Sequence, residues 1–372
     1  MSSELTTTNA ERGLSIGAVM RRAGEAANHA ASKHAFAEYR QRRAANTVRR
    51  QDAELALFAR FLQEVGAIPV PDELADLSGD DLQAALDKLA AVEGAELAST
   101  PAAWQGVTWG LIETFVKWQL GEGYAVGTVN LRLSTVKTYA KLAMKAGTLS
   151  DRDYALIRAV SGYRRQEAKN VDAGRAERGQ ETRIGDKKAG FKVLSIAQVK
   201  RLKAEHVDDG QGRRDRLIVC LLLDWGLRVG ELAGLTVESF NLDTLCPTLS
   251  FYREKVDKWA TFDLSSTPDT LSAARAYLEG NGAPESGPLL RGSTRSGRLI
   301  GKGMSKRAIT QRVGDLAGRV LGVEGLSAHD LRHTAATIYG KYKSTKELME
   351  IFGWSSPAMA VRYQEDAKTI TI

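Results

Sequence analysis

The stretch LSAHDLRHTAATIYG, residues 326–340, holds two histidines and an arginine in an otherwise small and apolar run. Ser327 and Asp330 form the S-x-x-D pattern of a helix N-cap, so the sequence predicts a helix that begins just before His329. Apolar residues at i, i+4 and i+7 predict the buried stripe of this helix, which consists of Leu331, Ala335 and Ile338.

His329, Arg332 and His333 share a neighbouring face of this predicted helix, close to its positive end, and such a face suits an anion. One alternative is a metal site, because the histidines have the i, i+4 spacing of a zinc protease helix. Against it, Arg332 would place a permanent cation beside a divalent one, and Asp330 is a short substitute for the glutamate base of such enzymes. A second alternative is a pair of core histidines. The choice depends on other segments.

A second candidate segment is DWGLRVGELAGL, residues 224–235. Its pattern predicts a helix that ends at Gly226 and a turn into another helix, whose first residues include Arg228. A guanidinium at that turn projects beside free backbone N–H groups, a geometry that suits oxyanions. Glu231 follows three residues later and can orient the arginine. Taken alone, such a pair is most often a surface ion pair.

A third candidate segment is IFGWSSPAMAVRYQEDA, residues 351–367. Gly353 is predicted to end one helix, Ser356 to cap the next and Pro357 to occupy its first position. This places Tyr363 near the end of a short helix. A tyrosine at such a place usually serves packing, but here it follows the arginine and histidine motifs in order.

These motifs resemble, in their order and spacing, the tyrosine recombinase or phage integrase family. The resemblance rests on GLRVGEL, a lysine on the predicted strand pair of PTLSFYREKVDKWATFDL, HDLRH, GW and a late tyrosine. It covers residues 191–365 strongly, and GYAVGTVNLRLSTVKTYAKLAMKAG looks like the family's core-binding domain. It implies a mainly α fold with a small antiparallel β-sheet in the C-terminal domain, arranged as a two-domain DNA clamp. Each motif is weak alone, whereas the ordered set is specific.

The resemblance implies a role for each matching residue. Tyr363 would be the nucleophile, and Arg228 and Arg332 would clamp the scissile phosphate. His329 would accept the proton of the tyrosine. Lys255 would be the general acid for the leaving 5′-oxygen.

Further residues match the family less directly. Lys258 is an alternative to Lys255, although the position of Lys255 fits the family better. Trp354 stands where many members have histidine, and its indole N–H can donate one hydrogen bond but cannot shuttle protons. His333 and Glu231 match supporting positions.

General chemistry agrees with these roles. A phosphodiester attacked by a phenol gains charge on its non-bridging oxygens, and two arginines offer planar donors that are always charged. A tyrosine with a pKa of about 10 needs help to lose its proton. The phosphotyrosyl bond conserves the energy of the broken linkage, so we expect neither a cofactor nor a metal.

Composition divides the chain into segments. Residues 1–43 are predicted to form an N-terminal arm or extra helix. Residues 44–165 show helical periodicity and are predicted to form a helical core-binding DNA-binding domain. Residues 166–190 have almost no large apolar side chains, so we predict a charged linker that cannot order itself. Residues 191–372 are the predicted catalytic domain.

A formal net charge of +7 suits a polyanionic partner. Two basic stretches, QRRAANTVRR and RGSTRSGRLIGKGMSKR, are predicted to contact the DNA backbone, with a solvated face as the alternative for each. The candidate contact residues are Arg42, Arg43, Arg49, Arg50, Arg291, Lys302, Lys306 and Arg307.

The resemblance implies double-stranded DNA target sites as the partner of a homo-tetramer that acts on two sites through a Holliday junction. The alternatives are relaxation of DNA in the manner of a type IB topoisomerase and a catalytically silent DNA-binding protein of the same fold. The target sequence, accessory proteins and direction of the reaction do not follow from these motifs.

The remaining features concern the compartment. The two cysteines, Cys220 and Cys246, form neither a disulfide framework nor a zinc pattern, which predicts a reducing compartment. The N-terminus is polar, and the apolar runs are far shorter than the ~20 residues that span a bilayer. We therefore expect a cytoplasmic, nucleoid-associated protein.

Overall fold

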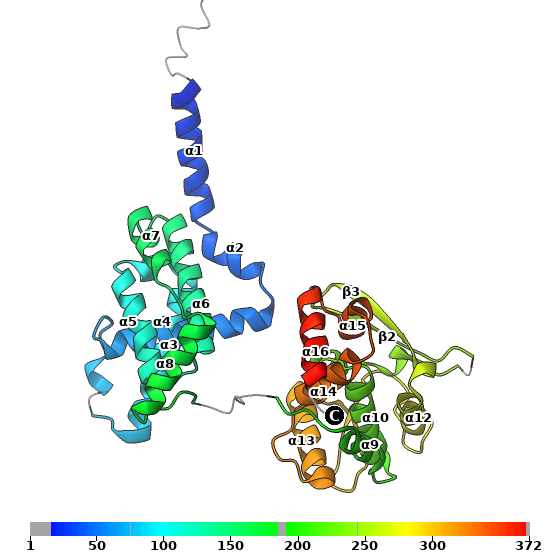
Figure 1. The fold of residues 1–372 in the computed structure, drawn as a ribbon. Coiled ribbons are helices and arrows are strands. Elements are labelled where there is room, and N and C mark those ends of the chain that lie inside the picture. Colours follow the sequence, from blue (N-terminus) through cyan, green and yellow to red (C-terminus); the bar gives the residue numbers. More distant parts are fainter. Residues whose placement is uncertain (1–15, 75, 185–190, 244, 370–372) are drawn as a thin grey trace, which may run out of the picture. The chain divides into compact units, whose positions relative to one another are not determined.

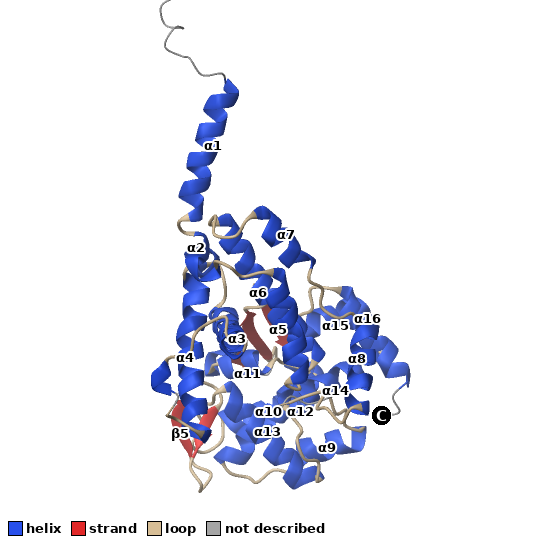
Figure 2. Cartoon of the chain, turned by 90° about the vertical axis from the view of Figure 1, so that its left-hand side faces the viewer, coloured by secondary structure: helices blue, strands red, loops and turns tan. Residues whose placement is uncertain are grey.

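The computed structural model describes residues 16–74, 76–184, 191–243 and 245–369 of the chain. The chain forms two compact units, residues 1–187 and residues 188–372 (Figure 1). Each unit buries a hydrophobic core of its own. Within the described residues the strands occur only in the second unit, and helices make up most of both (Figure 2).

The first unit is helical throughout its described residues, as predicted for residues 44–165. Its core joins aromatic side chains from several helices, among them Phe58, Phe115 and Tyr139, which are fully buried. The helices are α1 (Ile16–Ser32), α2 (Ala35–Gln41), α3 (Ala45–Glu64), α4 (Gly79–Ser99), α5 (Trp109–Gly121), α6 (Val126–Lys145), α7 (Asp151–Ala159) and α8 (Arg165–Glu177), with short 3₁₀ turns at Asp72–Leu74 and Pro101–Trp104.

Helix α8 begins at Arg165 and fills the first part of the stretch 166–190, for which the composition predicted no ordered element. Burial of a long charged side chain explains the difference. The side chain of Arg175 is only 2% exposed and donates hydrogen bonds to the carbonyl oxygens of Tyr124, at 3.2 Å, and Glu181. The arginine stem therefore supplies the packing that aliphatic residues usually supply. Residues 185–190 of the predicted linker lie outside the described residues.

The second unit combines helices with two small antiparallel sheets, as the predicted fold class requires. One sheet has the order β1-β2-β3 and the other pairs β4 with β5. The strands are β1 (Phe240–Asn241), β2 (Thr248–Arg253), β3 (Lys258–Asp263), β4 (Arg291–Ser293) and β5 (Leu299–Gly303). The helices are α9 (Ile196–Ala204), α10 (Gly210–Asp224), α11 (Val229–Gly234), α12 (Pro268–Leu278), α13 (Lys306–Leu321), α14 (Ala328–Gly340), α15 (Thr345–Phe352) and α16 (Pro357–Thr369), with 3₁₀ turns at Val237–Ser239 and Leu264–Ser266.

Helix α14 contains the opening motif and packs against α16 at a glycine. A Cβ at Gly340 would lie 2.6 Å from the carbonyl oxygen of Tyr363, so only glycine allows this approach. Ser327 caps α14, because its Oγ accepts from the N–H of Asp330 while the Asp330 carboxylate accepts from the N–H of Ser327 at 2.7 Å. The predicted start of α14 is confirmed. Close packing of α14 and α16 brings the histidine motif and the late tyrosine together.

No helix among the described residues is long and apolar enough to cross a membrane.

Candidate active site

Arg228 is half-buried at the start of α11, where Glu231 orients it. The guanidinium donates to Glu231 Oε1 at 2.8 Å, and the backbone N–H of Arg228 donates to Glu231 Oε2 at 2.8 Å. A further guanidinium N–H donates to the carbonyl oxygen of Gly353 at 2.9 Å. Two protein groups therefore fix the plane of this arginine, which leaves further N–H donors for a ligand.

Arg332 comes from α14 and is only 6% exposed. Its guanidinium donates to the carbonyl oxygens of Phe352, at 2.6 Å, and Gly226. Burial, and then the charge of Arg228, lowers the pKa of Arg332 to about 9, so the side chain is still protonated at neutral pH. The two guanidiniums are thus held near each other by backbone carbonyl groups.

His333 lies between an aromatic ring and the candidate nucleophile. Its ring stacks on Phe191 with centroids 3.9 Å apart, and its Nδ1 forms a hydrogen bond with the hydroxyl of Tyr363. Burial, and then the neighbouring His329, lowers the pKa of His333 to about 4. Because His333 is neutral at pH 7, its Nδ1 can accept from the tyrosine hydroxyl.

His329 is exposed, and its ring meets that of His333 edge to face at 4.5 Å. Although part of the side chain reaches solvent, neighbouring protein atoms partly desolvate the ring, and this desolvation, followed by the charge of Arg332, lowers the pKa of His329, with smaller contributions from Arg228 and Lys255. The hydrogen bond of the Tyr363 hydroxyl goes to His333, which sequence reasoning placed in a supporting position, rather than to His329.

Tyr363 occupies the middle of α16 and is only 5% exposed. Its ring lies parallel to that of Trp354 at 5.2 Å, and Trp354 stacks in turn on Phe352 at 4.8 Å. Burial raises the pKa of Tyr363 to about 12. The hydroxyl is therefore a poor acid and depends on a neighbouring base to give up its proton.

Lys255 lies in the exposed turn between β2 and β3, within the predicted strand-turn-strand segment. The alternative lysine, Lys258, is the first residue of β3 and pairs in register with Arg253. The positive charge of Lys255 acts on His329, which lies in the site. The choice of Lys255 over Lys258 stays a prediction.

Two residues of the site were missed by sequence reasoning. Arg253 is 3% exposed and donates to the carbonyl oxygens of Glu350 at 2.8 Å and Ile351 at 2.6 Å. Its signal in the sequence is an arginine at a buried position of the alternating strand β2. Phe191 gives no comparable signal, because its contact with His333 joins residues far apart in the chain.

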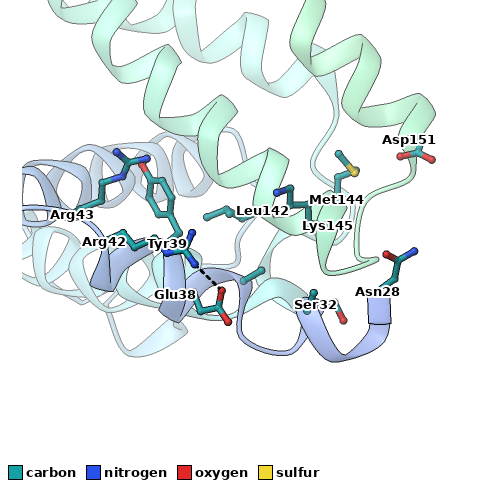
Figure 3. Close-up of a pocket in the computed structure, with 12 residues that line it drawn as sticks. Asn28, Ser32, Glu38, Tyr39, Arg42, Arg43, Leu142, Met144, Lys145 and Asp151 are labelled. Carbon is teal, nitrogen blue, oxygen red and sulfur yellow. Dashed lines mark ion pairs between the residues drawn. The ribbon is translucent and has the colours of Figure 1, made fainter. Parts of the chain in front are cut away.

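The first group of candidate DNA contacts lies on α3 and the end of α2. Arg42 pairs with Glu38 at 3.6 Å, and Arg43 lies over the ring of Tyr39 at 4.6 Å. Both arginines line a cavity of about 630 Å³ beside α1, α2 and the end of α6, together with Lys145 (Figure 3). The other two side chains bind within α3, Arg49 to Asn46 and Arg50 to Glu54.

The second group lies in the unit that holds the site. Lys306 and Arg307 are exposed at the start of α13 and line a cavity of about 540 Å³. A Cβ at Gly230 would lie 3.5 Å from Lys306 Nζ, so this ammonium approaches α11 two residues from Arg228. Lys302 is exposed on β5, and Arg291 on β4 donates to the carbonyl oxygen of Ser286 at 2.6 Å.

The metal alternative requires several ligand side chains close together. Among the residues that the structure describes, no group of three or more His, Cys, Asp or Glu side chains is placed to hold a metal ion. Asp330, the acidic residue of the zinc interpretation, is buried and accepts hydrogen bonds from the backbone N–H groups of Ser327 and Lys192.

Part of the chain is similar to known tyrosine recombinases. Residues 192–369 match the model of the phage integrase family. The tyrosine recombinase XerC of Mycobacterium sp. (strain KMS) is 36% identical over 129 residues, which are 33% of this chain and 39% of the relative. XerC of Natranaerobius thermophilus is 25% identical over 237 residues, which are 63% of this chain and 70% of the relative.

Solved structures share the fold. The Tn1549 transposon integrase in complex with transposon right end DNA aligns with a TM-score of 0.50 and 14% identity, over 85% of this chain and 97% of that chain. A lambda integrase dimer bound to a COC′ core site aligns with a TM-score of 0.50 and 15% identity, over 84% of this chain and 95% of that chain.

Proposed function

Because residues 192–369 belong to the phage integrase family of tyrosine recombinases, we propose that this chain is a site-specific DNA recombinase. It cleaves and rejoins DNA strands through a 3′-phosphotyrosyl intermediate. One observation supports the proposal most strongly. Arg228 and Arg332 donate to the adjacent carbonyl oxygens of residues 353 and 352, and Tyr363 is hydrogen-bonded to His333, which follows Arg332 in α14.

The chemistry proceeds by transesterification. The oxygen of Tyr363 attacks the scissile phosphorus, an O–P bond to the tyrosine forms, and the bond from phosphorus to the 5′-oxygen breaks. The leaving oxygen takes a proton from Lys255. Arg228 and Arg332 hold the non-bridging oxygens as their charge grows, which is the largest single source of stabilisation in such reactions.

The proton of Tyr363 leaves through the histidine pair. The hydroxyl is hydrogen-bonded to His333 Nδ1, so a His333 ring protonated on Nε2 would be the immediate acceptor, and the His329 ring is next to it at 4.5 Å. Family resemblance assigns the acceptor role to His329. If Tyr363 rotates toward a bound phosphate, both histidine rings can take part in the proton transfer.

The partner of the protein is double-stranded DNA. The two similar structures hold a transposon end and a core site, respectively, which supports this proposal. The basic residues near the site, Lys302, Lys306 and Arg307, are exposed and available to DNA phosphates. We propose that four copies act on two sites through a Holliday junction, in the cytoplasm where the DNA lies.

The experiment that tests this function begins with covalent complexes trapped on genomic DNA, which identify the target. Two copies of that target on separate plasmids should then recombine in the presence of the protein alone or with a cell extract. Relaxation of supercoiled DNA that lacks the target would instead support the topoisomerase alternative. Specific binding without any covalent complex would support the catalytically silent DNA-binding protein.

A further inference from the structure

The C-terminal end of α15 is bound by three arginines. The last carbonyl groups of a helix have no partner within the helix and lie at the negative end of its dipole. Here four consecutive carbonyl oxygens, those of residues 350–353, each accept from a guanidinium. The donors are Arg253, Arg332 and Arg228.

Arg253 differs from Arg228 and Arg332 because it binds two of these four carbonyl oxygens, whereas each of the others binds one. It binds two adjacent carbonyl oxygens at 2.8 and 2.6 Å with its two terminal nitrogens. It is 3% exposed and packs over the rings of Phe251 and Phe262, whose centroids are 5.3 and 5.2 Å from the guanidinium carbon. Both terminal nitrogens of Arg253 are thus bound to protein carbonyl groups.

We propose that Arg253 is a positioning residue of the cleavage reaction, which fixes the end of α15 and the segment after it relative to the two phosphate-binding arginines. The inference rests on the proposed function, because it assigns Arg228, Arg332 and Tyr363 the roles given above. It adds a residue to which the family resemblance assigned no role.

Arg253 is connected to Tyr363 through two consecutive residues, Gly353 and Trp354. Gly353 ends α15 in the left-handed conformation, with φ of 58°, and a Cβ there would lie 2.5 Å from Arg253 Nη1. The next residue, Trp354, donates its backbone N–H to Met349 and stacks its ring on that of Tyr363. A shift of the guanidinium therefore moves the Trp354 ring that supports the tyrosine.

Arg253 also shares a carboxylate with Arg228. Its buried Nε–H has no hydrogen-bond partner, and Glu231 Oε1 lies 3.7 Å from it while it accepts from Arg228 at 2.8 Å. When Arg228 turns toward a phosphate, Glu231 can close on this N–H. Arg253 thus offers Glu231 an alternative partner, so the carboxylate is not left as an unpaired buried charge.

The experiment compares Arg253→Lys and Arg253→Met with Arg214→Lys as a matched control. Arg214 is a buried arginine of the same unit, 2% exposed, which donates to the carbonyl oxygen of Arg291 at 2.7 Å and lies outside the site. Single-turnover cleavage is measured on a nicked duplex that traps the covalent complex, over a range of DNA concentrations. The temperature is chosen so that circular dichroism shows each variant folded.

A positioning role predicts that the cleavage rate at saturating DNA falls about 10- to 100-fold in Arg253→Lys. The DNA concentration at half-maximal rate stays within about twofold of wild type. The lysine keeps the charge but not the fork that spans two carbonyl groups. If the rate falls no further than in Arg214→Lys, the inference is overturned, and Arg253→Lys decides alone where Arg253→Met does not fold.

A second substrate separates positioning from leaving-group chemistry. Sulfur in place of the scissile 5′-oxygen leaves without a general acid, so it should restore cleavage by Lys255→Met but not by Arg253→Lys. Restoration of both would show that Arg253 acts through the leaving group and would overturn the inference. Cleavage by the wild type serves as the reference, since its absence would count against the proposed function and not against this residue.

Discussion

The chemistry proposed for Tyr363 depends on two features, the burial of its hydroxyl and a neutral neighbouring histidine. Packing against Trp354 holds the ring, and the same burial raises the pKa of the Tyr363 hydroxyl to about 12. The adjacent His333 has its pKa lowered to about 4, which keeps it able to accept a proton over the physiological range. A buried donor and a neutral acceptor are thus already joined.

The pH dependence of cleavage should reveal the cover that Phe191 gives to His333. A histidine with a pKa near 4 is neutral above that pH, so wild-type cleavage should change little between pH 8 and pH 5. In Phe191→Ala the imidazole of His333 becomes more exposed to solvent, so its pKa rises toward about 6.5. The cleavage rate of this variant should then fall as the pH drops through that value. Phe191→Leu keeps an apolar cover and should resemble wild type. Identical profiles for Phe191→Ala and wild type would contradict this role.

The lowered pKa of His333 also makes the free energy of unfolding depend on pH. Its folded pKa lies below the unfolded value of about 6.5, so the unfolded chain binds the extra proton between that pH and about 4. His333 therefore contributes stability above pH 6.5 that is lost as the pH falls through this window.

Arg228→Lys tests the planar clamp. A lysine retains the positive charge but cannot reproduce the two-point contact with Glu231 and phosphate, so the cleavage rate should fall by about 10²-fold or more. A gel-shift assay should show DNA binding within a few-fold of wild type, because many phosphate contacts remain. Cleavage at the full wild-type rate would contradict the role of Arg228 in binding the scissile phosphate.

At the scale of elements, contact between α14 and α16 brings the site together. Gly340→Ala would place a methyl group 2.6 Å from the carbonyl oxygen of Tyr363 and should destabilise the unit by about 1–3 kcal/mol while it slows cleavage. Gly318→Ala is the control, since α13 leaves open space there, and it should stabilise by about 0.5–1 kcal/mol. Urea unfolding measures both. Equal effects of the two substitutions would contradict the close approach.

Sequence predicts those elements whose signals are local. The capping pair of Ser327 and Asp330 fixes the start of α14, and the alternation in residues 248–263 predicts the β2–β3 hairpin. Helix α8 was missed because a single buried arginine, Arg175, stabilises it in place of an apolar stripe. Lys368 and Thr369 continue α16, while residues 370–372 lie outside the described residues.

The contacts of the site follow a similar division. The arginines, histidines and tyrosine could be selected from motifs, but their partners could not. Arg253 and Phe191 act through contacts with Glu350, Ile351 and His333, which are distant in sequence and follow only from tertiary packing.

At the scale of the whole molecule, two separate cores predict two unfolding events. Phe58 is fully buried in the first unit, so Phe58→Ala should cost about 3–5 kcal/mol there and lower the midpoint of one transition only. The second transition, which reports the unit that holds Tyr363, should stay in place. Calorimetry resolves the two, and a single transition that shifts as a whole would contradict independent cores.

The central claim is that the oxygen of Tyr363 becomes bonded to a DNA phosphorus held by Arg228 and Arg332. Its most direct test is mass spectrometry of the peptide that remains attached to DNA after a nicked target duplex has been cleaved and the protein digested. We expect the nucleotide on Tyr363, and Tyr363→Phe should bind the same duplex but yield no attached peptide. Attachment at another residue, or an adduct that persists in Tyr363→Phe, would contradict the claim.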